Sequence, residues 1–170
     1  MELERWHDFF VLIGTAGATL VALLFVAISL GAGFLTDKRS NATRAFFSPV
    51  VVHFTAVFFI SAVGLFPAHT PALFAALVGG CAGVGAAISL FTTVQLLRNS
   101  WTNFLQDHLA YGLLPLISYA VLLVAAAMIF KEHEYALLVL ACALLTLLIV
   151  NIRNAWDLTL AMVRQHARKR

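Results

Sequence analysis

The sequence predicts an all-α integral membrane protein built from five transmembrane helices in an antiparallel bundle. Three observations predict this fold class: the chain is 62% hydrophobic, only 11% of its 170 residues are charged, and its apolar residues gather in five long runs. A soluble domain carries about 25% charged residues. This chain has too few charged residues to form the water-exposed surface of a soluble domain. Its composition therefore excludes a soluble enzyme, a nucleic-acid-binding module and a disordered chain.

Each of the five runs approaches or exceeds the roughly 20 apolar residues that cross a bilayer as a helix. Their ranges in order are 9–34, 47–66, 72–97, 109–130 and 135–152. The connections between them are short, which predicts antiparallel neighbours. No change in composition divides the chain, so we expect one domain over 1–170, in which 153–170 forms a basic interfacial helix after the last span.

Basic residues are distributed unevenly between the two sides that five spans create. Only Arg5 and Lys131 fall on the side of the N-terminus, whereas the other nine of the eleven lysines and arginines fall on the side of the C-terminus. Because cytoplasmic segments collect positive charge, we expect the N-terminus outside and the C-terminus in the cytoplasm. We therefore expect a multi-pass protein of the cell membrane, such as a bacterial inner membrane, whose basic tail contacts anionic lipids.

The fourth run carries a polar stripe at helical spacing. His108, Tyr111, Pro115, Ser118 and Tyr119 fall near one face of the expected helix. Because Pro115 has no N–H, the Tyr111 carbonyl loses its α-helical partner, which predicts a kink. Two interpretations stay open: the stripe lines a polar site, or Tyr111 is an interfacial anchor and Pro115 only shapes packing.

The second run carries His53, which we expect on the cytoplasmic half of its helix. A neutral imidazole can donate to one partner and accept from another, so His53 is either bonded within the core or part of a functional site, as intramembrane ionisable residues often are. No acidic residue lies deep in any run, which argues against a carboxylate relay for protons. The candidates for lining a pore or ligand pocket are His53, Thr92, Gln95, His108, Tyr111, Pro115, Ser118 and Tyr119.

The third run contains a Gly-x-x-x-Gly pattern formed by Gly79 and Gly83. Small residues at this spacing let two helix backbones approach closely in a membrane. We therefore expect the Gly79/Gly83 face to pack against another helix, within one subunit or between subunits of a homo-oligomer.

Three histidines in the polar segments at the outer side, His7, His69 and His133, are the candidate metal ligands, together with the neighbouring carboxylates. They come from three separate segments, and no pair has the spacing of a metal motif. Solvated turns are therefore the favoured interpretation of these residues.

The chain holds no nucleophile elbow, phosphate-binding loop, dinucleotide fingerprint or potassium-filter sequence, so we do not expect an enzyme. Three functions stay open. The first is a homo-oligomeric channel or transporter, or a subunit of one, for an ion or small solute. The second is a haem-binding or other redox membrane protein that uses His53 and His108 as axial ligands. The third is an accessory or assembly protein for another membrane complex.

Overall fold

The computed structural model describes residues 3–31, 37–67, 70–98 and 109–167. Within these ranges every regular element is a helix. The elements in chain order are η1 (Leu3–Trp6), α1 (His7–Gly31), α2 (Asp37–Gly64), α3 (Pro71–Arg98), η3 (Leu109–Leu113), α5 (Leu114–Phe130) and α6 (Ala136–Ala167).

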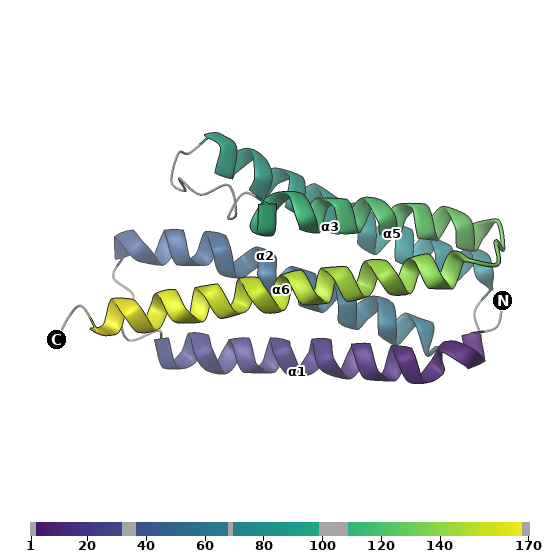
Figure 1. Ribbon diagram of the computed structural model, residues 1–170, viewed down its shortest axis with the longest axis horizontal. Helices are drawn as coiled ribbons and strands as arrows, with labels where there is room; N and C mark the ends of the chain where they lie inside the picture. The colour runs from purple at the N-terminus through teal and green to yellow at the C-terminus, as the bar shows by residue number, and fades with distance from the viewer. Residues whose placement is uncertain (1–2, 32–36, 68–69, 99–108, 168–170) are drawn as a thin grey trace.

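The five α-helices run up and down as one elongated bundle (Figure 1). The chain begins at one end of the bundle, called the N-terminal end, and α6 finishes at the opposite end, called the C-terminal end. The closest helix pairs are α1 with α2, α3 with α5, and α5 with α6. The all-helical, antiparallel part of the prediction is therefore confirmed in the described residues.

In the part of the chain that the structure describes, four apolar helices are long enough to cross a membrane, which indicates a membrane-embedded protein. They are Leu3–Ala27, Pro71–Gln95, Tyr111–Phe130 and Ala136–Leu160. The second helix differs, because its apolar stretch Pro49–Gly64 is shorter than a full span. The first part of α2 is rich in polar and charged residues and begins at Asp37, ahead of the predicted start at 47. Counting apolar residues finds the part of a helix that suits lipid and misses a polar extension.

The last helix continues without a break from Ala136 to Ala167. The predicted span 135–152 and the predicted interfacial helix are therefore parts of one element as far as residue 167, and they follow one axis in Figure 1. No glycine or proline interrupts this segment, so nothing in the sequence ends the helix between them. The contact of its final turns with a membrane surface stays a prediction.

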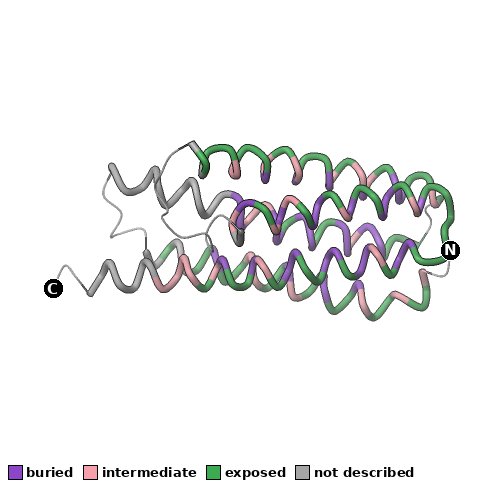
Figure 2. The backbone as a smooth tube through the Cα atoms, turned by 45° about the horizontal axis from the view of Figure 1, so that its top comes forward, coloured by how far each residue is buried: buried purple, intermediate pink, exposed green. Residues whose placement is uncertain are grey.

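Buried apolar side chains from all five helices fill the centre of the bundle. Figure 2 shows the buried positions facing inward along each helix and the exposed positions facing outward. Between membrane helices, van der Waals packing stabilises such a core, because the hydrophobic effect no longer drives helices together in lipid. Several of its largest side chains belong to the half of the bundle nearer the N-terminal end: Phe10, Ile60, Phe74, Leu122, Ile129, Leu140 and Leu144.

Candidate functional site

A histidine and a tyrosine meet inside the bundle. The hydroxyl oxygen of Tyr119 on α5 lies 2.8 Å from Nδ1 of His53 on α2. The two side chains are 0% and 1% exposed, and their ring centroids lie 5.4 Å apart. Either the hydroxyl donates to an unprotonated Nδ1, or a protonated Nδ1 donates to the hydroxyl oxygen. In surroundings of low dielectric constant such a hydrogen bond is strong, and losing one partner is costly.

A glycine on α3 makes room for this pair. A Cβ atom built on Gly85 would overlap the ring of Tyr119, so any larger residue would have to displace the ring or the helix. Gly85 thus lets α3 approach α5 closely enough to enclose the tyrosine. The sequence contained Gly85 within its glycine-rich run, but only the rotation of α3 decides which of these glycines faces α5.

A second tyrosine of the fourth span, Tyr111, bonds a different helix. The hydroxyl of Tyr111 donates to the backbone carbonyl of Asn154 on α6, with 3.0 Å between the oxygens. Tyr111 lies in η3, a single π-helical turn that comes directly before α5. Pro115 follows at the start of α5 and cannot supply an α-helical N–H to this turn. The distortion expected near Pro115 is therefore present, and it takes the form of a wider turn.

This π-helical turn packs against α3 through another glycine. A Cβ atom on Gly112 would lie 2.8 Å from Oγ1 of Thr93, whose hydroxyl donates to the Ser89 carbonyl on its own helix. The contact holds the start of the fourth span against α3. Sequence reasoning did not single out Gly112.

Two asparagines of α6 are buried near the boundary between the predicted last span and the predicted interfacial helix. Asn151 and Asn154 are 0% and 1% exposed. The hydrogen-bonding atoms of the Asn151 amide have no partner in the described part of the chain. The pattern that reveals their burial is present in the sequence: the buried stripe of α6 continues through Leu140, Leu144, Leu147, Asn151 and Asn154 at spacings of three and four residues.

The remaining predicted lining residues lie in different surroundings. Pro115 and Ser118 are buried on the same face of α5 as Tyr119, and the Ser118 hydroxyl donates to the Leu114 carbonyl. Thr92 is partly buried and donates to Ile88 of its own helix, whereas Gln95 is exposed. His108 lies outside the described residues, so the proposed haem ligation by His53 and His108 stays a prediction.

The two glycines of the predicted Gly79/Gly83 packing face have different surroundings in the structure. A Cβ on Gly79 would meet the Cβ of Ala126 on α5 at 3.5 Å, which is ordinary contact. A Cβ on Gly83, or on its neighbour Gly80, would meet no atom within 4 Å. Within the chain, the expectation therefore applies to Gly79 alone, because Gly83 points away from the bundle.

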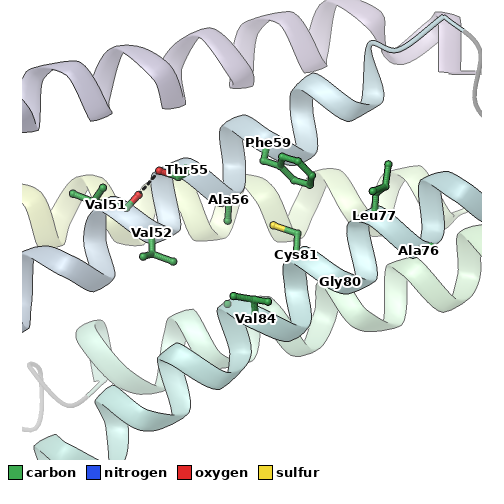
Figure 3. Close-up of a pocket in the computed structure, with 11 residues that line it drawn as sticks. Val51, Val52, Thr55, Ala56, Phe59, Ala76, Leu77, Gly80, Cys81 and Val84 are labelled. Atoms are coloured by element: carbon green, nitrogen blue, oxygen red, sulfur yellow. Dashed lines mark hydrogen bonds between the residues drawn. The ribbon is translucent and has the colours of Figure 1, made fainter.

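An apolar groove runs between α2 and α3 on the outside of the bundle (Figure 3). Its volume is about 510 Å³. The hydroxyl of Thr55 is directed to the Val51 carbonyl at 2.8 Å, so it is already used within α2. The residues that line the groove are Val51, Val52, Thr55, Ala56, Phe59, Ala76, Leu77, Gly80, Cys81, Val84 and Gly85.

The candidate metal ligands do not converge in the part of the chain that the structure describes. His7 contacts the adjacent Asp8 at 3.1 Å, and the ring of His133 lies against Tyr135. His69 lies outside the described residues. No group of three or more histidine, cysteine, aspartate or glutamate side chains gathers in 3–31, 37–67, 70–98 and 109–167.

No known family, curated protein or solved structure matches the chain significantly.

Proposed function

We propose that the protein transports an ion or a small polar solute across a membrane, as an assembly of several copies. One observation carries the proposal: His53 and Tyr119 form a fully buried hydrogen bond between two of the helices. Polar and ionisable side chains are costly within a membrane, and those that are present often mark a path for ions or substrates. The pair has no neighbouring carboxylate among the buried residues described, so it suits a guest without a strong positive charge.

The core of a single copy is closed. Towards the N-terminal end, the apolar side chains of Ile60, Leu122 and Leu144 are 0% exposed. A continuous aqueous path past the buried His53–Tyr119 pair would have to part these layers, so we place the path of the solute in a state in which the bundle opens. We propose that a second copy packs along the groove between α2 and α3, where Gly80 leaves space for a helix backbone.

Flux into liposomes tests the proposal. The purified protein would be reconstituted, and the entry of Na⁺, K⁺, Cl⁻ and a small neutral solute compared with that into empty liposomes. We expect wild-type flux of at least one species, and loss of that flux in His53→Gln and Tyr119→Phe. The matched control is Tyr135→Phe, because Tyr135 is 55% exposed and lies in the turn before α6. Wild-type flux equal to that of empty liposomes would refute transport, and unchanged flux in both variants would refute the role of the pair.

A second candidate function is the docking of another membrane protein, and the apolar groove between α2 and α3 favours it. The two functions make different predictions for a groove variant. If the groove serves only a foreign partner, Gly80→Ile leaves the number of copies in the purified assembly unchanged and wild-type liposomes show no flux. If the groove serves self-assembly for transport, Gly80→Ile reduces both the number of copies and the flux.

A further inference from the structure

We infer that the bundle holds bound water beside Asn151, in a polar layer between Tyr111 of η3 and Tyr119 of α5. The nitrogen and oxygen of the Asn151 amide are both buried without a partner in the described residues. Burying such an amide unpaired costs about 1–3 kcal/mol, and nearly all buried polar groups in proteins have a partner in protein or ordered water.

The height of Asn151 in the bundle follows from the contacts around it. Tyr111 in η3 and Tyr119 in α5 are eight residues apart along the fourth span, which places them at most about 12 Å apart along its axis. Tyr111 bonds to Asn154 of the antiparallel α6, so Asn151 lies about 4.5 Å from that contact in the direction of Tyr119. Asn151 therefore occupies a level between the Tyr111–Asn154 contact and the His53–Tyr119 contact.

Several hydroxyls at these levels already have a partner. The Tyr119 hydroxyl pairs with His53, the Tyr111 hydroxyl donates to the Asn154 carbonyl, and the Ser118 hydroxyl donates within α5. The buried Ser89 hydroxyl of α3, like the Asn151 amide, has no partner in the described residues. The amide of Asn151 needs a partner that both donates and accepts, and the hydroxyls of Tyr119 and Ser118 retain the capacity to accept another hydrogen bond. Water meets this requirement, and buried waters make about three hydrogen bonds to such groups.

The chemistry of the layer favours water over a cation. The buried part of the described chain contains no carboxylate to balance a positive charge. The π-helical turn of η3 and Pro115 adjoin the same layer, and ordered water commonly accompanies such irregular turns in membrane helices. The layers of Val57, Ile60 and Leu122 close the core on the other side of His53, so water reaches the layer from the C-terminal end, past the half-buried Tyr111.

Radiolytic hydroxyl labelling of the full-length protein tests this inference without any transport assay, so its outcome is independent of the proposed function. Hydroxyl radicals made from bound water oxidise the side chains beside that water. We expect Tyr119, although 0% exposed, to be oxidised faster than Phe74, which is equally buried in the apolar half of the bundle. In Asn151→Leu the rate at Tyr119 should fall to that of Phe74, while the exposed Tyr135 keeps its rate.

Two further measurements keep the test decisive: the labelling of a second variant, and the labelling of the wild type by itself. Asn151→Ser retains a group that can bond water, so it should preserve the labelling of Tyr119. A purely structural role of Asn151 does not require that the labelling be preserved. If wild-type Tyr119 is labelled no faster than Phe74, the layer is dry and the inference is overturned, even if neither variant folds. Unchanged labelling of Tyr119 in a folded Asn151→Leu protein would also overturn it, because the water would then not depend on Asn151.

Discussion

The hydroxyl of Tyr119 lies 2.8 Å from Nδ1 of His53, which joins helices α2 and α5 across 66 positions of the chain. Both side chains are buried, so their hydrogen bond lies inside the closed bundle. Gly85 encloses the tyrosine ring from α3. This one contact therefore couples three helices.

The first prediction concerns the energy of the His53–Tyr119 bond. Tyr119→Phe leaves a buried imidazole nitrogen without its partner, so the free energy of unfolding should fall by about 0.5–2 kcal/mol. His53→Leu combined with Tyr119→Phe should cost less than the sum of the two single changes, because no unpaired group remains. Thermal unfolding in detergent measures both effects. Tyr135→Phe is the control, and additive single and double variants would show that the two side chains do not interact.

The second prediction compares two glycines of α3 that differ only in their surroundings. Gly85→Ala places a methyl group on the ring of Tyr119, so we expect a loss of about 1–3 kcal/mol in stability or a displaced tyrosine. Gly83→Ala meets open space and should leave the stability of the single chain unchanged or slightly raise it. Unfolding curves of the two variants check the contrast. Equal losses in both would mean that α3 is rotated differently from the structure.

The third prediction concerns self-assembly along the groove between α2 and α3. Gly80→Ile adds bulk in the groove where we propose that a second copy packs, so the assembly should dissociate to fewer copies while the helix content stays constant. Light scattering of the protein in detergent or nanodiscs gives the number of copies. Ala127→Ile on the exposed side of α5 serves as the matched control. If the control dissociates the assembly and Gly80→Ile does not, the interface lies elsewhere.

The fourth prediction concerns orientation in the membrane, which follows from charge alone. After Cys81 and Cys142 are replaced, a single cysteine at His133 should react with a membrane-impermeant thiol reagent in intact cells. A cysteine at Ser40 should react only after the membrane is opened. The reverse pattern would invert the topology, and labelling of both positions in intact cells would contradict the number of spans.

Much of the helical architecture was determined by the sequence itself. In lipid, the backbone N–H and C=O groups of each span must pair within the protein, and a helix pairs them within the span. The apolar runs located all five helices, and Pro115 located the distorted turn before α5. The polar beginning of α2 was not predicted, because hydropathy reports which residues suit lipid and does not report where a helix begins. Polar face patterns also placed Tyr119 and Ser118 correctly on one buried side of α5.

Only the tertiary structure decided which of these polar residues meet. A helix has a known periodicity, but its rotation about its own axis depends on how all neighbouring side chains pack together. That rotation turns Gly85 towards Tyr119 and leaves Gly83 facing outward, although the two glycines are only two residues apart. The same packing pairs Tyr119 with His53 and buries Asn151, because the inward stripe of α6 continues past the apolar residues into two asparagines. The local sequence determines which residues share a face of a helix, and the packing of the five helices determines which residues that face contacts.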